Sequence, residues 1–137
     1  MSTLAVIPAR AGSRGLPGKH LLLIGGIPMI VHTIRAGLAA GSVDRVLVST
    51  NDAAVARVAR RAGVEVVSRP DELAQDDSPT LPVIQHALRE AEAGGDRIEL
   101  VVTLQPTAPL RSAEQIDAAI ALLRDSSVRS AVSVARL

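Results

Sequence analysis

Short apolar runs alternate along the whole chain with longer stretches of helical periodicity. The apolar runs are rich in Val, Leu and Ile and predict strands at residues 3–8, 44–50, 64–68, 98–104 and 130–135. The stretches between them predict helices over 28–40, 52–62, from 78 or 80 to 93, and 112–125. This alternation is typical of βα units around a parallel sheet. We therefore predict one α/β domain over residues 1–137, with a Rossmann-like parallel sheet flanked by helices.

Several helix ends carry capping signals. Asp52 is a candidate N-cap, and the alternative is that it is a residue of a binding site. Ser112 and Gln115 have the spacing of a capping box, and Ser78 or Thr80 could cap the helix that follows them.

Composition narrows the function classes. Lys and Arg number 15 against 14 Asp and Glu, so the net charge of +1 favours neither a nucleic acid nor a membrane surface as partner. The chain has no Phe, Tyr or Trp, so it cannot stack aromatic side chains on bases, and its lack of Cys fits a reducing cytoplasm. No apolar run approaches the roughly 20 residues that cross a bilayer. We expect a cytoplasmic protein whose electrostatic function is local.

Three stretches follow strands directly, at the edge where parallel sheets bind ligands: 9–19, 51–52 and 105–111. The first has Gly12 and Gly15, which let backbone N–H groups approach an anion. Arg10, Arg14 and Lys19 could neutralise a triphosphate there. The alternative is a polar strand-to-helix connection without a ligand.

The spacing excludes two well-known phosphate loops. A P-loop that ends at Gly18 and Lys19 would need Gly at Ser13 and a hydroxyl at His20. A dinucleotide fingerprint that starts at Gly12 would need Gly at Arg14 and Pro17. A mononucleotide is therefore the better prediction.

Four motifs in order, "IPARAGSRGLPGKH", "VLVSTND", "VVSRPDELAQDDSPT" and "LQPTAPLR", make the chain resemble the acylneuraminate cytidylyltransferases, or CMP-sialic acid synthetases. The resemblance covers essentially the whole chain. It implies transfer of CMP from CTP to an acidic nonulosonic sugar, with pyrophosphate released and Mg²⁺ expected with CTP.

The resemblance also implies roles for individual residues. Lys19, Arg10 and Gln105 would be catalytic, with Lys19 stabilising transition-state charge. Gln105, Thr107 and Arg111 would bind the sugar. The nucleotide-binding residues would be Ala9, Arg10, Gly12, Ser13, Arg14, Lys19, His20, Arg69, Asp76 and Thr80. His32 and His86 have no partner at metal-ligand spacing, and we interpret them as structural.

Two departures from the family pattern stand out. His20 replaces a usual Asn, and an imidazole can donate to a phosphate or pyrimidine oxygen but cannot reproduce a carboxamide's paired donor and acceptor. Family members are also longer, and their later half supplies the metal-binding aspartates, more of the sugar pocket and a dimerisation arm. The chain therefore resembles the family's amino-terminal part. We expect it to have no metal ligands of its own, and we expect a homodimer only if the dimerisation arm exists.

Two alternatives stay open. "LPGKHLLLIGGIPMIVH" is similar to the opening of the 3-deoxy-manno-octulosonate cytidylyltransferases, whereas "RPDELAQDDSPT" and "LQPTAPLR" favour the acylneuraminate group. The other alternative is a nucleotide-binding fragment or regulatory module without catalysis.

Overall fold

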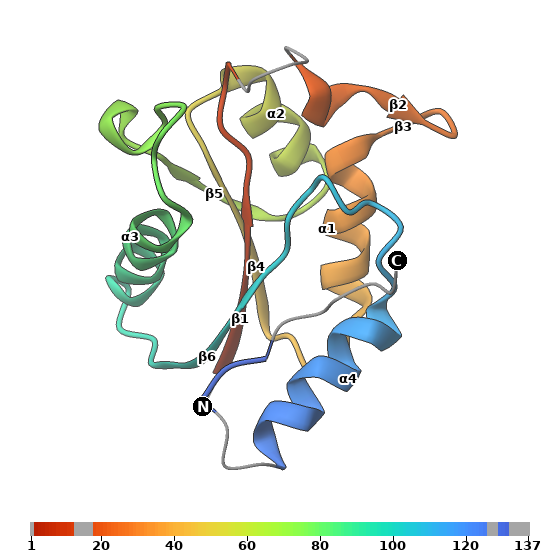
Figure 1. Ribbon diagram of the computed structural model, residues 1–137, viewed down its shortest axis with the longest axis vertical. Helices are drawn as coiled ribbons and strands as arrows, with labels where there is room; N and C mark the ends of the chain where they lie inside the picture. The colour runs from red at the N-terminus through yellow and green to blue at the C-terminus, as the bar shows by residue number, and fades with distance from the viewer. Residues whose placement is uncertain (1, 13–17, 126–128, 132–137) are drawn as a thin grey trace.

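A four-stranded parallel sheet forms the centre of the molecule (Figure 1). The computed structural model describes residues 2–12, 18–125 and 129–131. The strands are β1 (Ser2–Pro8), β4 (Arg45–Thr50), β5 (Glu65–Ser68) and β6 (Ile98–Thr103). They lie in the order β5-β4-β1-β6, and each pairing is parallel. Four predicted strands are thus confirmed to within one residue. Of the fifth, 130–135, residues 130 and 131 are not in a strand and the rest lie outside the described residues.

Helices cover both faces of the sheet (Figure 1). They are α1 (Met29–Ala39), α2 (Ala53–Arg61), α3 (Thr80–Glu92) and α4 (Ala113–Arg124), so all four predicted helices are confirmed. In Figure 1, α3 lies on one side of the sheet and α1, α2 and α4 lie on the other. None of the helices in the described part of the chain combines the length and apolar character that crossing a bilayer requires.

The central strand β1 supplies side chains to two cores. Ala5 and Ile7 pack into the larger core with Ile34 of α1, whereas Leu4 and Val6 pack into the smaller one with Ala87 of α3. Successive strand residues point to opposite faces, so β1 is apolar at both sets of positions. This burial holds β1 in place, and its carboxyl end is a fixed point for the loop that follows.

The capping predictions have mixed outcomes. The Asp52 carboxylate accepts hydrogen bonds from the backbone of Ala54 and Val55, and Ser112 forms the predicted capping box with Gln115. At α3 the prediction is wrong, because Pro79 is the N-cap residue and no side chain caps the helix. Ser78 Oγ instead accepts from the Gln75 amide at 2.9 Å, within its own turn.

A short hairpin between β1 and α1 was not predicted. Its strands are β2 (Leu23–Ile24) and β3 (Ile27–Pro28), joined by Gly25 and Gly26, which both have positive φ angles. Two glycines between apolar pairs are a hairpin signal, since this tight turn needs such angles. His32 of α1 fixes the hairpin through a hydrogen bond between Nε2 and the Ile24 carbonyl at 2.8 Å. The interpretation of His32 as structural is confirmed.

An ionic network lies at the amino end of the sheet. Arg45, the first residue of β4, contacts both carboxylate oxygens of Glu65, at 3.1 and 2.8 Å. It also donates to Asp96 Oδ2 at 2.9 Å and to the Ala91 carbonyl at 3.1 Å. The hydrogen bonds from Arg45 hold the pKa of Glu65 below its ordinary value. The network ties β4 to β5 and to the end of α3.

Candidate functional site

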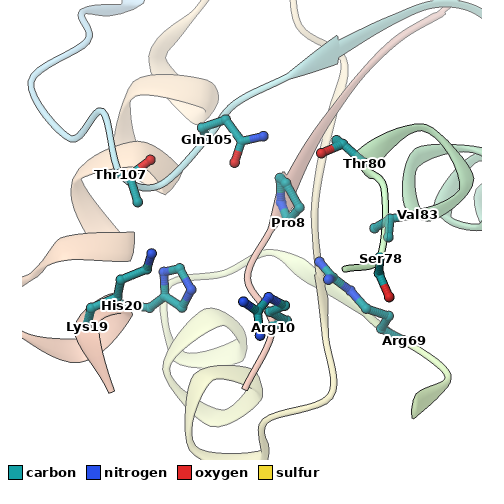
Figure 2. Close-up of a pocket in the computed structure, with 10 residues that line it drawn as sticks. All are labelled: Pro8, Arg10, Lys19, His20, Arg69, Ser78, Thr80, Val83, Gln105 and Thr107. Atoms are coloured by element: carbon teal, nitrogen blue, oxygen red, sulfur yellow. The ribbon is translucent and has the colours of Figure 1, made fainter. Parts of the chain in front are cut away.

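A polar pocket of about 210 Å³ lies at the carboxyl ends of the strands (Figure 2). It is built from the loops after β1, β5 and β6, the start of α3, and the short 3-10 helix η1 (Lys19–Leu21). The residues that line it are Pro8, Arg10, Lys19, His20, Arg69, Ser78, Thr80, Val83, Gln105 and Thr107. Three of them, Arg10, Lys19 and Arg69, have basic side chains, and none of the described lining residues is a carboxylate. The pocket is therefore suited to an anion.

Backbone contacts fix the loop after β1. The Ala9 amide donates to the Ser49 carbonyl at 2.9 Å, and the Ala11 amide donates to Asn51 Oδ1 at 2.7 Å. Ala9 is fully buried. The last residues of β4 and its loop thus hold the chain on both sides of Arg10, which positions that side chain at the pocket.

Arg10 joins two segments at the pocket. Its Nη1 atom lies 3.0 Å from Asp76 Oδ1 and donates to the Gly12 carbonyl at 3.1 Å. Gly12 has a φ of +65°, which favours glycine at this turn. Asp76 therefore orients the guanidinium of Arg10. Asp76 is not among the residues that line the pocket.

Arg69 is a buried cation. It is only 6% exposed, and its guanidinium donates to Ser49 Oγ at 3.3 Å and to the Ser49 carbonyl at 3.2 Å. Burial, together with the charge of Arg10, lowers its pKa to about 10. The group stays protonated near neutral pH, so the fold keeps two guanidinium charges near each other. This arrangement favours an anionic ligand that offsets both.

Lys19 and His20 reach the pocket from η1. Figure 2 shows them on the same wall, opposite Arg69 and Ser78. His20 is 7% exposed, and its Nδ1 atom is buried without a hydrogen-bond partner in the described structure. Burial first, and then the charge of Lys19, lower the pKa of His20. The imidazole is thus held neutral beside the cations.

Gln105 and Thr107 follow β6 and line the pocket, with Thr107 on the same side of the view in Figure 2 as Lys19 and His20. Gln105 also lines a second hollow of about 1250 Å³ between β6 and α4. Arg111 lies in this second hollow and not in the first, and burial lowers its pKa. Arg111 was predicted to bind the sugar with Gln105 and Thr107; it shares the second hollow with Gln105, whereas Thr107 lines only the first.

The structure assembles most of the predicted site. Predicted residues that line the pocket are Arg10, Lys19, His20, Arg69, Thr80, Gln105 and Thr107. Ala9, Gly12 and Asp76 contact or support the loop, and Ser13 and Arg14 lie outside the described residues. Residues that sequence reasoning missed are Pro8, Ser49, Asn51, Ser78 and Val83. Asn51 carried a signal, since it directly follows a strand at the ligand-binding edge.

The described residues do not form a protein-held metal centre. In residues 2–12, 18–125 and 129–131, no three His, Asp or Glu side chains come together in a way that could hold an ion. His86, predicted to be structural, lies 3.8 Å from Glu90 one helical turn away. The donor set of the pocket is cationic, which fits phosphates rather than a bare divalent ion.

Comparison with known proteins identifies a family. Residues 4–137 of the chain match the sequence pattern of a family described as "Cytidylyltransferase". The chain is 36% identical to an N-acylneuraminate cytidylyltransferase of Streptococcus agalactiae, over 97% of this chain and 32% of that protein. It is 42% identical to a 3-deoxy-manno-octulosonate cytidylyltransferase of Rhodopseudomonas palustris, over 98% of this chain and 53% of that protein.

Solved structures give the same picture. A CMP:2-keto-3-deoxy-manno-octonic acid synthetase complexed with CTP superposes with a TM-score of 0.77 at 27% identity, covering 91% of this chain and 48% of that one. The chain spans from about a third to about half of the proteins that it matches here. The likeness confirms the predicted Rossmann-like fold.

Proposed function

Because this chain belongs to the cytidylyltransferase family, we propose that it binds CTP in the cationic pocket and transfers CMP to a hydroxyl group of an acidic sugar. The observation that supports this proposal is the convergence of Arg10, Lys19 and Arg69 on a pocket without a lining carboxylate among the described residues. Such a group of cations neutralises the charge of a triphosphate. The pocket of about 210 Å³ is below the roughly 300–1,000 Å³ of sites that enclose a whole ligand, so it would hold part of the nucleotide.

The reaction is an in-line displacement at phosphorus. The oxygen of the sugar hydroxyl attacks the α-phosphorus of CTP, the bond to the pyrophosphate oxygen breaks, and the hydroxyl proton passes to solvent. Negative charge grows on the leaving pyrophosphate. Lys19 would stabilise that charge, because its ammonium group is a flexible point charge at the pocket wall.

The two arginines would have different tasks. Arg10 is oriented by Asp76 and by the Gly12 carbonyl, so it would present a fixed face to the phosphates. Arg69 is buried against Ser49, on the side of the pocket where Ser78 and Val83 lie (Figure 2). We propose that Arg69 lies beside the nucleotide and adds its positive charge to that of Arg10.

Gln105 and Thr107 would bind the sugar. Gln105 borders both hollows, so its carboxamide can contact a sugar that extends from the nucleotide pocket toward the larger hollow. Arg111 lies in that larger hollow with a buried Nη1 atom that has no partner among the described residues. A sugar carboxylate would complete its hydrogen bonds.

Magnesium would accompany the nucleotide. We propose that CTP brings the ion on its phosphate oxygens, where it would offset phosphate charge. Since the described residues do not fit a protein-held ion, we assign charge stabilisation to the chain's own cations.

For the sugar we propose a nonulosonic acid of the sialic type, because the "RPDELAQDDSPT" and "LQPTAPLR" motifs favour that group. The 42% identity to a 3-deoxy-manno-octulosonate enzyme makes that eight-carbon acid the second candidate. Both have a carboxylate beside the anomeric hydroxyl. Pyrophosphate release should be measured with CTP, Mg²⁺ and each acid in turn. Faster release with N-acetylneuraminate supports the first assignment, and faster release with the octulosonate overturns it.

A nucleotide-binding role without catalysis is a separate candidate, since the chain covers about half or less of its relatives compared above. Thermal unfolding separates this role from catalysis. CTP with Mg²⁺ should raise the melting temperature more than ATP with Mg²⁺ does. A CTP-specific shift without turnover would favour the binding role, and equal shifts for the two nucleotides would contradict a cytidine site.

A further inference from the structure

His20 combines three properties that no other lining residue has. It is titratable near neutral pH, it is buried with only 7% of its surface exposed, and its Nδ1 atom has no hydrogen-bond partner within the described chain. A buried nitrogen without a partner is costly, because it has lost its water without gaining another bond. The ring that carries this nitrogen lines the cationic pocket.

Burial and the charges around the ring together set its protonation. Lys19 lies next to it on η1, Arg10 comes from the loop after β1, and Arg69 from the loop after β5. All three disfavour a positive imidazole, whereas Asp52 of the α2 cap favours it. Together with burial, which is the largest effect, they lower the pKa of the ring. In the free protein His20 is therefore neutral at pH 7.

A polyphosphate reverses this balance. Its negative charges lie between the same cations and cancel their repulsion of an imidazolium. Its oxygens only accept hydrogen bonds, so a ring with two N–H donors suits them better than a neutral ring with one.

We propose that His20 takes up a proton when a polyphosphate enters the pocket, and that the imidazolium then donates a hydrogen bond to a phosphate oxygen. This inference rests on the proposed nucleotide site and deepens it, since it makes affinity dependent on pH. The proton comes from solvent and returns to it when the ligand leaves.

The direction of the effect follows from linkage. A group whose pKa is higher in the complex than in the free protein makes binding tighter as the pH falls through the interval between the two values. Each unit of difference changes affinity by about tenfold over that interval. Triphosphate affinity should therefore rise from pH 7.5 to pH 6 through His20.

Imidazole resonances in NMR spectra test this directly, because the chain has only three histidines, His20, His32 and His86. Each is titrated from pH 4.5 to 8.5 with and without inorganic triphosphate, and His20→Asn assigns the His20 signal. We expect the titration midpoint of His20 to rise when triphosphate is added, and we expect the addition to leave the other two resonances' midpoints unchanged. An unchanged or lower His20 midpoint at saturating triphosphate would overturn the inference.

Affinity supplies the second measurement. The triphosphate itself titrates near pH 6.5, so wild type is compared with His20→Asn, and His86→Asn is the matched control. The pH-dependent gain of affinity should be smaller in His20→Asn and unchanged in His86→Asn. Equal gains in all three proteins would overturn the inference. Absence of triphosphate binding to wild type at any pH would instead contradict the proposed function.

Discussion

Charged side chains gather at both ends of the sheet, but their surroundings differ. At the amino end, Arg45 donates to Glu65, Asp96 and the Ala91 carbonyl, so its guanidinium is compensated within the fold. At the carboxyl end, Arg10, Lys19 and Arg69 share one pocket, and burial with like charge lowers the pKa of Arg69. Like charges that lie close together reduce stability, so a fold that keeps three cations around one pocket favours a binding site there. The amino end stabilises the fold, and the carboxyl end is prepared for a ligand.

The largest expected effect is at the pocket. Lys19→Ala removes a cation that would donate charge-assisted hydrogen bonds, and it should weaken CTP binding by about 10- to 100-fold. Stability should change little, because Lys19 has no ion pair with any described residue. Isothermal titration calorimetry measures the affinity. The control is Arg97→Ala, which removes an exposed cation at the amino end. If both variants lose affinity equally, the two ends do not differ in function.

The reciprocal change is at the amino end. Arg45→Met keeps much of the side chain's length but breaks the contacts to Glu65 and Asp96, and it should reduce the free energy of unfolding by about 1 kcal/mol. Both carboxylates are more than half exposed, at 55% and 62%, so solvent screening limits the effect. CTP affinity should stay unchanged. Urea unfolding measures the stability, and a variant with lower affinity at full stability would contradict the division of roles.

A smaller effect is expected where the fold supports the pocket. Asn51→Ala removes the acceptor that holds the Ala11 amide, and the loop that bears Arg10 should become less ordered. We expect CTP affinity to fall about three- to tenfold, in keeping with the loss of one hydrogen bond. Asn51→Asp retains an acceptor at this place and is the matched variant. Equal losses in the two variants would show that the hydrogen bond to Ala11 is not the cause.

The smallest effect concerns stability against pH in the absence of a ligand. The pKa of His20 is lower in the folded protein than its ordinary value of 6.5, so the unfolded chain binds more protons in that interval. Stability should thus rise as pH increases toward 6.5 and decline as pH falls below it. Urea midpoints from pH 5 to 7.5 for wild type and His20→Asn measure the contribution. A slope that is identical in the two proteins would contradict a buried neutral imidazole.

The fold was predicted well because its signals are local. Apolar runs located β1, β4, β5 and β6 to within one residue, and the Asp52 and Ser112 caps marked two helix starts correctly. The β2–β3 hairpin was missed because strands of two residues are too short to show a period. The start of α3 at Thr80 was predicted, but its cap was not, because Ser78 bonds within its own turn and Pro79 is the N-cap residue.

The site was predicted in part, for a related reason. Arg10, Arg69 and Gln105 follow strands directly, and topology brings such residues to one edge. The pairing of Arg10 with Asp76 and the contact of Arg69 with Ser49 join distant segments, which sequence patterns do not reveal. Arg111 follows β6 closely too, yet its loop turns toward α4 and the second hollow.

The position of β1 in the sheet has a consequence for how the chain folds. The first strand pairs with β4 on one side, Leu4 opposite Arg45, and with β6 on the other, Leu4 opposite Val101. During synthesis, β1 leaves the ribosome before both of its neighbours and cannot gain the second one until β6 (Ile98–Thr103) has been made. Contacts between such distant segments slow folding and leave apolar edges open to association meanwhile. The strand that anchors the loop bearing Arg10 is thus the one that most needs protection while the protein is being made.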